Sequence, residues 1–522
     1  MNEKEWQPSV NPWLIATGVM LATFMVVLDT SVANVALLQM AGSFSSSSDE
    51  VIWVLTSYLV ANGIVLPSTA WFSSFFGRKR FLIICIVIFT FASALCGIST
   101  SLGMMIFARI LQGLGGGALM PISQAVLLES FPHEKRGVAM SIFGLGIIVA
   151  PIIGPTLGGW ITDNYSWHWI FYINVPVGIL SIILSEMFIE DPPYARKSIP
   201  KSIDYIGFLA LIIWLVTLQI ILDKGQRADW FESSWICWLA IISVSAMIFF
   251  IIWEISFKDS IIDLKVFTDR NFAIGTVLST FVGAVLYGTL AMLPLFLQNL
   301  MKYPAVQSGI AITPRGIGSF FTILLAGFLS NKIDTRIQIA FGFVLLGISN
   351  YMLGNINLSI SMDNIILPNV LSGFALGFIF IPLTTATFGT LKNKQITNAT
   401  GIFGLMRSIG GGIGVSIVGM LLSRNTQIHQ TYLASHLNPG NLFFQQKLDM
   451  AKHFLSMNMD MVTATHKAQA IIYGMLVKNA TLQSFIDIFK LYGLICLILV
   501  PTAFIFKKAV LSNKTSDNAA AH

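Results

Sequence analysis

Apolar runs of helical length, separated by short polar connectors, occupy almost the whole chain. A helix needs about 20 predominantly apolar residues to cross the hydrocarbon core of a bilayer, and each run approaches that length. The runs form a group of six, then two, then six more, near Trp13–Leu37, Val51–Trp71, Phe81–Ser99, Met104–Leu128, Val138–Ile161, Trp169–Ile189, Tyr205–Leu222, Trp235–Trp253, Phe272–Gln298, Gln307–Leu329, Ile337–Leu353, Ile365–Phe388, Thr400–Leu422 and Phe485–Phe506. This pattern predicts an all-α polytopic membrane protein with about fourteen spans.

The composition excludes a soluble protein. Hydrophobic residues make up 55% of the 522 and charged residues only 11%, whereas a soluble globular protein carries about 25% charged residues. The net charge of +6 does not indicate nucleic-acid binding, because the basic residues form short clusters between apolar runs, where they report membrane orientation. Lipid is therefore the expected surroundings of most of the surface, and no nucleic-acid partner is predicted.

Lys and Arg concentrate in alternate connectors, which predicts the orientation of the chain. One side collects clusters such as 78–80 and 196–201, whereas the short connectors on the other side keep only Lys224, Arg227 and Lys302. The positive-inside rule places the first side, with both termini, in the cytoplasm. The N-terminus lacks a basic region, which favours the first run as a retained span over a removed signal peptide.

The spacing of the runs predicts four parts. Residues 1–191 are expected to form an N-terminal six-helix bundle, and 192–268 a linker with two additional transmembrane helices. A C-terminal six-helix bundle is expected over 269–508, followed by a cytoplasmic tail over 509–522. The second bundle contains one long periplasmic segment, 424–482.

This long outer segment is rich in helix-forming residues. Phe443–Val477 contains many Gln, Ala, Met, Lys and Leu residues and no proline, which predicts helices outside the membrane. We interpret the segment as a docking surface for a partner, or alternatively as a cap that packs on the outer mouth. Four of the seven histidines lie here, but their spacing fits no metal-ligand pattern, so no metal site is predicted.

Two ionisable residues lie inside the apolar runs at comparable depth, roughly 8 to 12 Å below the outer surface at 1.5 Å of rise per residue: Asp29 and Arg109. A charge in hydrocarbon costs a few kcal/mol, so such residues usually line a polar path. We interpret Asp29 as a carboxylate that takes up and releases protons, the alternative being a fixed structural ion pair. Arg109 stays charged, so it either tunes a carboxylate or bonds backbone carbonyls.

Three other polar residues in the runs are candidates for a substrate cavity or a helix-connecting network. Gln112 follows Arg109 by three residues, beside a face of small residues that lets another helix come close. Arg315 and Arg407 lie near mid-membrane in the second half, and both are expected to face the central cavity. Either they bind substrate or they connect helices.

The fifth run combines closely spaced glycines and prolines: Gly146, Pro151, Gly154, Pro155, Gly158 and Gly159. A small-residue packing motif would explain the glycines. It would not explain two prolines four residues apart, because each frees a backbone carbonyl and bends the helix. The run is therefore interpreted as a conformational hinge.

Several motifs, taken in order, resemble the major facilitator superfamily, and within it the fourteen-helix drug/proton antiporters of the EmrB type. Residues 28–36, which include Asp29 and Asn34, are similar to that group's first-helix motif. Residues 107–113 and 150–159 resemble its fourth- and fifth-helix motifs. Glu134–Gly137 and Trp169–Pro176 add subfamily character.

The resemblance implies two six-helix bundles related by a pseudo-twofold axis, with substrate bound between them. It implies proton-coupled efflux of hydrophobic or amphiphilic toxic compounds across a bacterial inner membrane, with Asp29 and Arg109 coupling the proton and Asn34 a further cavity candidate. The proton gradient would supply the energy without a cofactor. A periplasmic membrane-fusion adaptor and an outer-membrane channel would complete a tripartite pump.

The inner gate loops depart from the superfamily pattern. The first keeps Gly77, Arg78 and Lys79, but Ser74 replaces the usual acidic residue. Its counterpart in the second half keeps Lys332, Asp334 and Arg336. We therefore expect that the inner gate does not latch through ion pairs in the common way.

Three other functions are compatible with fewer of these features. The same fold could export fatty acids or another specific amphiphile. A membrane-embedded lipid-modifying enzyme is disfavoured because no nucleophile, histidine and carboxylate occur together in the spans. A channel is disfavoured because single scattered charges provide neither a ring nor a filter.

Overall fold

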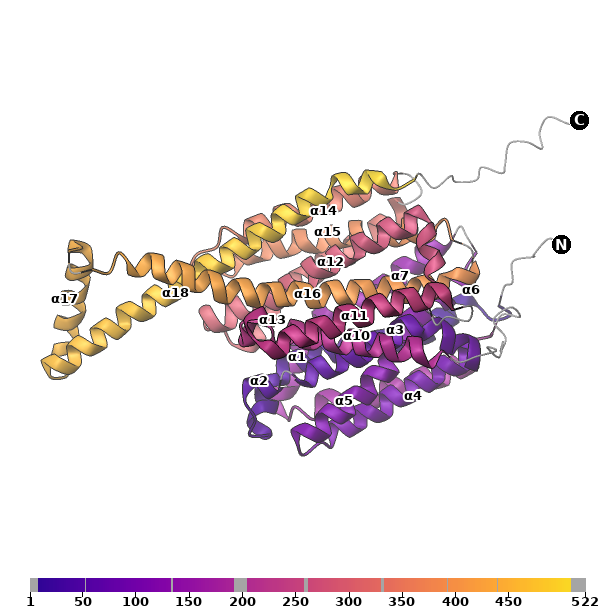
Figure 1. Cartoon of the computed structure of the whole chain (residues 1–522), viewed down its shortest axis with the longest axis horizontal. Helices are drawn as coiled ribbons and strands as arrows, with labels where there is room; N and C mark the ends of the chain where they lie inside the picture. The colour runs from indigo at the N-terminus through magenta and orange to yellow at the C-terminus, as the bar shows by residue number, and fades with distance from the viewer. Residues whose placement is uncertain are drawn as a thin grey trace, which may run out of the picture.

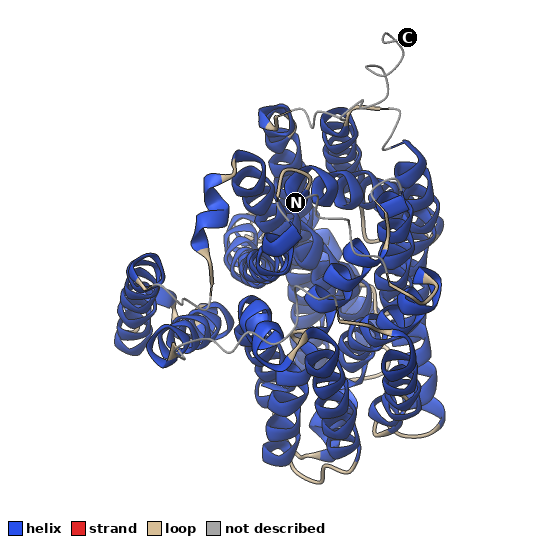
Figure 2. Ribbon diagram, turned by 90° about the vertical axis from the view of Figure 1, so that its right-hand side faces the viewer, coloured by secondary structure: helices blue, strands red, loops and turns tan. Residues whose placement is uncertain are grey.

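The computed structural model describes residues 8–51, 53–132, 135–191, 204–257, 262–329, 333–391, 393–438 and 440–507. This part of the chain contains helices and loops but no strand, as Figure 2 shows. The first half comprises α1 Pro12–Ser43, α2 Ser48–Val51, α3 Trp53–Phe76, α4 Arg78–Gly97, α5 Leu102–Gly116, α6 Leu119–Ser130, α7 Arg136–Asn164, α8 Trp169–Tyr172 and α9 Asn174–Phe188. Two helices follow, α10 Tyr205–Lys224 and α11 Ser234–Ser256. The second half comprises α12 Arg270–Leu295, α13 Ala305–Leu329, α14 Thr335–Leu353, α15 Asp363–Phe388, α16 Asn393–Ala434, α17 Leu442–Ser456 and α18 Met461–Leu499.

Fourteen helical segments of the described chain are long and apolar enough to cross a membrane. This confirms the predicted number of spans. One predicted span is divided, because the run near Met104–Leu128 forms α5 and α6, with Gly117 and Ala118 between them. The predicted orientation of the two termini stays a prediction.

The helices of each half pack mainly on one another. In the first half α1 lies against α6, α7 and α9, while α5 lies against α3 and α4. In the second half α12 pairs with α16, α13 with α15, and α14 with α15 and α18. The two halves meet along two lines of contact, α7 with α13 and α3 with α16, which we call the α7–α13 seam and the α3–α16 seam.

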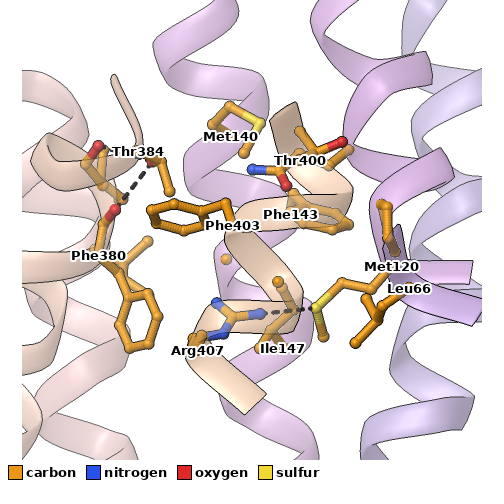
Figure 3. Close-up of a pocket in the computed structure, with 16 residues that line it drawn as sticks. Leu66, Met120, Met140, Phe143, Ile147, Phe380, Thr384, Thr400, Phe403 and Arg407 are labelled. Atoms are coloured by element: carbon orange, nitrogen blue, oxygen red, sulfur yellow. Dashed lines mark hydrogen bonds between the residues drawn. The ribbon is translucent and has the colours of Figure 1, made fainter. Parts of the chain in front are cut away.

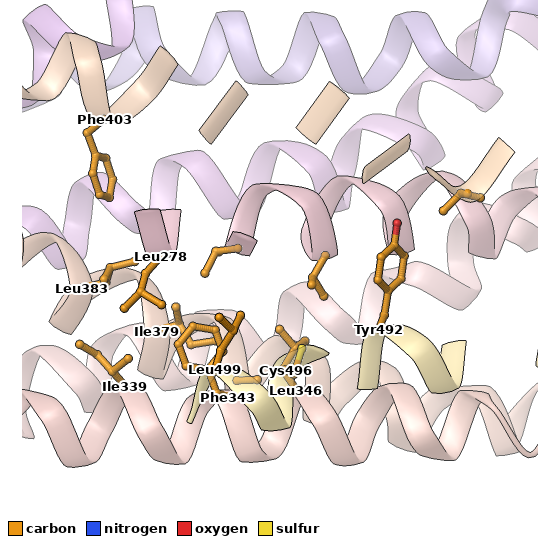
Figure 4. Packing of buried hydrophobic residues seen from close by; sticks show 14 of the residues in the cluster. Leu278, Ile339, Phe343, Leu346, Ile379, Leu383, Phe403, Tyr492, Cys496 and Leu499 are labelled. Carbon is orange, nitrogen blue, oxygen red and sulfur yellow. The ribbon is translucent and has the colours of Figure 1, made fainter. Parts of the chain in front are cut away.

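Buried apolar side chains fill the second half. One cluster joins α12, α14, α15, α16 and α18, and Figure 4 shows part of it, with Phe343, Ile379 and Cys496 directed toward one another. The same cluster includes Leu211 of α10 and Leu66 of α3. Of the two additional helices, α10 is therefore packed against α3 and α16, whereas α11 packs mainly on α10 and lies at the edge of the protein.

Two helices of the second half are much longer than a bilayer requires. With 42 residues in α16 and 39 in α18, they reach roughly 60 Å each at 1.5 Å of rise per residue, about twice the thickness of the hydrocarbon core. Figure 1 shows both helices leaving the bundle together, with α17 at the tip, at the end opposite the chain termini. Residues 424–482 are thus helical for most of their length, and the two spans continue into them without interruption.

Candidate functional site

The central polar contact of the first half joins α1 to α5. Asp29 is 2% exposed and Arg109 is fully buried. The Nη1 atom of Arg109 donates a hydrogen bond to Oδ2 of Asp29 over 2.6 Å. Each ion of such a buried pair has lost its hydration, so removing one partner leaves a costly uncompensated charge.

Two amides complete the surroundings of the carboxylate. Gln112 Nε2 and Asn174 Nδ2 donate to Oδ1 of Asp29 over 2.8 and 2.7 Å. Gln112 also donates to the Ser93 hydroxyl over 2.6 Å and accepts a bond from Arg109 over 2.7 Å. The carboxylate therefore connects α1 directly with α5 and α9, and through Gln112 and Ser93 with α4, so a change in its charge alters a network that joins four helices.

Arg109 is held in place by contacts that do not depend on Asp29. Its Nε donates to the carbonyl oxygen of Val54 over 2.9 Å, and its guanidinium carbon lies 4.5 Å from the centre of the Tyr58 ring. The helices approach closely here because Gly113 has no side chain, and a Cβ atom would lie 2.5 Å from the carbonyl oxygen of Tyr58. Protonation of Asp29 would therefore leave a fixed cation without its anion.

The structure brings three of the predicted site residues together and leaves one apart. Asp29, Arg109 and Gln112 form one hydrogen-bonded network, whereas Asn34 is exposed on α1. Sequence reasoning missed Asn174, although this residue lies in the Trp169–Pro176 motif, and Ser93, an isolated serine in an apolar run without a distinguishing signal. The roles of these residues in proton coupling stay predictions.

A small cavity of about 70 Å³ lies between the two halves, as Figure 3 shows. Its walls come from both halves and are mostly apolar, with Leu66 and Phe143 on one side and Phe380 and Phe403 on the other. Ligand pockets usually measure about 300 to 1,000 Å³. The cavity must therefore enlarge before it can accept a drug-sized compound.

Arg407 is the basic residue in the wall of this cavity. Its Nη2 lies 3.2 Å from the sulfur of Met120 on α6, and its guanidinium carbon lies 5.6 Å from the ring centre of Phe380. Figure 3 shows the side chain reaching across from α16 toward Met120. Within the described residues no carboxylate pairs with Arg407, so a cation faces an apolar space.

The other mid-membrane arginine is placed differently. Arg315 is 6% exposed, and its two terminal nitrogens lie 3.3 and 3.4 Å from the hydroxyl of Thr289 on α12. It is not among the residues that line the cavity between the halves. In this conformation Arg315 connects α13 to α12 and does not face the cavity between the halves.

The glycine- and proline-rich run forms one continuous helix, α7. A Cβ atom on Gly154 would lie 2.5 Å from the Ser31 hydroxyl, and one on Gly158 would lie 2.7 Å from a methyl group of Val32. Packing against α1 therefore accounts for these two glycines. Gly146 and Gly159 have more room, with nearest contacts at 3.4 Å, and the hinge role of the run, with Pro151 and Pro155, stays a prediction.

The first inner gate loop finds an acidic partner outside its own motif. Arg78, at the start of α4, forms an ion pair with Glu129 of α6, and its Nη2 lies 3.3 Å from the Thr397 hydroxyl of α16. This contact links the two halves at the termini end of the bundle. Glu129 lies far from the loop in sequence, so the loop motif alone does not identify it as the partner of Arg78.

The remaining gate residues have local contacts. Gly77 has a positive φ of 86°, which suits glycine, and Asp191 accepts a bond from the backbone nitrogen of Lys79 over 2.8 Å. In the second loop Asp334 caps α14 by accepting from the backbone nitrogen of Arg336 over 3.0 Å. Lys332 lies outside the described residues.

Fourteen helices able to span a membrane, two packed halves, a cavity between them and a buried carboxylate–arginine pair together give the architecture of a multi-pass membrane transporter. Comparison with known proteins identifies the family. Residues 19–415 match the family model of the Major Facilitator Superfamily, and the chain belongs to that family.

The similar proteins include several bacterial exporters. The chain is 35% identical to the multidrug export protein EmrB of Haemophilus influenzae, over 88% of this chain and 89% of that protein. It is 36% identical to the probable multidrug resistance protein EmrY of Escherichia coli, over 85% and 87%. It is 34% identical to the fatty acid resistance protein FarB of Neisseria gonorrhoeae, over 93% and 94%.

A solved structure shares the fold. The crystal structure of the human organic anion transporter MFSD10 superimposes with a TM-score of 0.57 at 13% identity, covering 94% of this chain and all of that chain. The family match, the bacterial exporters among its relatives and the fourteen apolar helices place the protein in the bacterial inner membrane as a multi-pass transporter.

Proposed function

We propose that this protein exports hydrophobic or amphiphilic toxic compounds in exchange for protons. The observation that carries the proposal is the buried network around Asp29, in which one carboxylate and its amide partners connect four helices of one half. The names of the relatives, multidrug export proteins and multidrug resistance proteins, support the substrate class.

The proton acts through the pairing of Asp29 with Arg109. When Asp29 binds a proton it loses its charge, and the attraction to the fixed Arg109 guanidinium falls. A conformation in which other groups or water solvate Arg109 then becomes relatively more stable. Because coupling requires each ligand to prefer one state, protonation drives transport only if this network differs between the two states of the cycle.

The cavity supports a substrate with a large apolar surface. Its wall residues are aromatic, aliphatic or methionine side chains for the most part, with Gln124 and Thr384 among the few polar groups. Such flexible, apolar walls can adapt to compounds of different shape. This favours export of several hydrophobic compounds over export of one polar metabolite.

One observation favours a second candidate substrate, a fatty acid or a similar anionic amphiphile. Arg407 faces the cavity without a carboxylate partner in the described chain, so an acidic head group could pair with it. The relative FarB is named for fatty acid resistance. We expect Arg407→Gln to weaken binding of dodecanoate about tenfold while binding of dodecanol stays within a factor of two.

Purified protein in proteoliposomes tests the proposed function. An outward-directed pulse of substrate should produce a saturable proton flux, detected with a pH-sensitive dye trapped in the vesicles. Dodecanoate, dodecylamine and a hydrophobic drug would serve as probes. A proton flux that never saturates would indicate a channel, and absence of flux with all three probes would contradict exchange.

We further propose that the projecting hairpin of α16, α17 and α18 docks a periplasmic adaptor protein of a tripartite pump. The hairpin carries large apolar side chains in the open, such as Phe443 at 80% and Phe454 at 71% exposed, and exposed apolar groups outside a membrane usually mark a protein contact. The variant Phe443→Ser/Phe454→Ser should remove drug resistance in cells but keep proton flux in proteoliposomes. Unchanged resistance would favour the alternative, a cap without a partner.

A further inference from the structure

The two seams between the halves differ in what lies outside them. At the α3–α16 seam a further helix, α10, is packed against the protein along its whole length. The Phe208 ring of α10 lies 6.2 Å from the Phe72 ring of α3, and Lys224 at the opposite end lies 5.5 Å from the ring centre of Trp53. Leu211, between these contacts, is fully buried.

The second added helix, α11, packs on α10 and adds a further layer outside the α3–α16 seam. Trp253 of α11 donates a hydrogen bond to Asp204 at the start of α10 over 2.8 Å, and Trp214 packs on Phe250 at 6.0 Å. Helix α10 contacts both α3 and α16, and a Cβ atom on Gly412 of α16 would lie 3.3 Å from its Gln219, while α11 packs on the outer side of α10. The cavity is thus separated from lipid on this side by two layers of helix.

At the α7–α13 seam the wall is a single layer. The helices contact each other directly, with a Cβ atom on Gly144 lying 3.5 Å from Ile323, and both residues line the central cavity. No other helix covers the outward-facing side chains of this seam in the described structure. Ile153 is 43% exposed, Trp160 52% and Ile317 51%. Only this pair of helices stands between cavity and bilayer here.

A second and larger hollow lies along the same seam. It has a volume of about 520 Å³ and is lined by α7 and α13, with Ile153 and Leu157 deeper in the membrane and the polar Asp163 and Asn164 at the hairpin end. Roughly 9 Å of helix separates it from the central cavity along α7, at 1.5 Å of rise per residue. We call it the α7–α13 groove.

The groove matches an amphiphile in size and in polarity. Its volume lies within the range of about 300 to 1,000 Å³ that is usual for small-molecule sites. Its apolar part lies at membrane depth and its polar part at the bundle end, which is how an amphiphile is oriented in a leaflet. The central cavity is small, and the ion pair of Arg78 and Glu129 with its link to Thr397 closes the termini end.

We propose that amphiphilic substrates leave the central cavity sideways through the α7–α13 groove into the leaflet at the hairpin end, and that α10 and α11 block the corresponding path at the α3–α16 seam. This inference rests on the proposed export function and names its route. The two added helices then have a transport role: they restrict lateral exchange with lipid to one side. The glycines and Pro151 of α7 lie in the wall that has to move.

Photolabelling in proteoliposomes tests the route. A twelve-carbon fatty acid and a twelve-carbon amine, each with a diazirine at the far end of the chain, would be added to wild-type protein and irradiated. Labelled peptides from α7 and α13 are expected, and an excess of the unlabelled compound should suppress them at least about fivefold. Label on α10 and α11 should come from general lipid contact and should not be suppressed. Suppressible label on α10 or α11, or none on α7 and α13, would overturn the inference.

Two matched substitutions give an independent test. Ile153→Trp fills the groove, whereas Ile241→Trp adds the same bulk at a 55% exposed position on α11. We expect the first to lower the rate of export about fivefold, as overfilling a site does, and the second to change it less than twofold. Equal effects would contradict the route. Wild-type proton flux without suppressible label in the groove would overturn only the route. Absence of flux with both compounds and with the hydrophobic drug would overturn the export function on which the route rests.

Discussion

Replacing Asp29 by asparagine separates the charge of this residue from its shape. The side chain keeps its size and one oxygen that can accept a hydrogen bond, but Arg109 loses the anion 2.6 Å away. Arg109 is fully buried and cannot lose its proton, so it remains an uncompensated cation. Breaking a buried pair in this way typically costs about 3 to 5 kcal/mol.

We therefore expect Asp29→Asn to lower the free energy of unfolding by about 3 to 5 kcal/mol and to abolish substrate-dependent proton flux. The reverse change, Arg109→Gln, should cost less stability, because a buried carboxylate can take up a proton and become neutral. The double variant Asp29→Asn/Arg109→Gln should recover most of the stability lost in Asp29→Asn, since no unpaired charge remains, yet it should not transport.

The assay combines unfolding of the purified protein in detergent, followed by tryptophan fluorescence, with proton flux in proteoliposomes. Asp163→Asn makes the same chemical change at an exposed position of α7 and should leave stability unchanged within about 0.5 kcal/mol. Two results would refute the reasoning. One is normal proton-coupled export by Asp29→Asn, and the other is a double variant no more stable than Asp29→Asn alone.

Three further predictions concern other parts of the molecule. Glu129→Gln removes the anion that Arg78 contacts, so we expect a larger fraction of protein molecules in which the two halves are separated at the termini end. A cysteine introduced there should react faster with a labelling reagent. An unchanged labelling rate would argue that the Arg78–Glu129 ion pair does not hold the two halves together. Gly113→Val should reduce folded yield strongly because its Cβ would meet the backbone of α3, whereas Gly103→Ala, where nothing lies within 4 Å, should not. Burial lowers the pKa of His168, which lies between two spans. The stability from its neutral form is full above its ordinary pKa of about 6.5 and is lost as pH falls below that value through the lower pKa of the folded state. His168→Gln should therefore make the free energy of unfolding depend less on pH between about 7 and 5.

The amino-acid sequence determined the class of protein and the number of spans. Both follow from a local property, the length of each apolar run compared with the thickness of a bilayer, and no tertiary contact is needed to read it. Depth along each run also follows from residue count, so Asp29 and Arg109 could be placed at a similar level. Helix rise alone made them possible partners.

Tertiary structure decided which side chains meet. Asp29 contacts residues 80 and 145 positions away in the chain, and Arg78 contacts Glu129 51 positions away. These contacts depend on how each helix is rotated about its axis, and an apolar run facing lipid on one side and protein on the other shows little difference between its two faces. For the same reason the position of α10 and α11 relative to the other helices could not be predicted from the sequence. Their hydropathy identified them as spans, but only packing showed that they cover one seam and leave the other exposed to lipid.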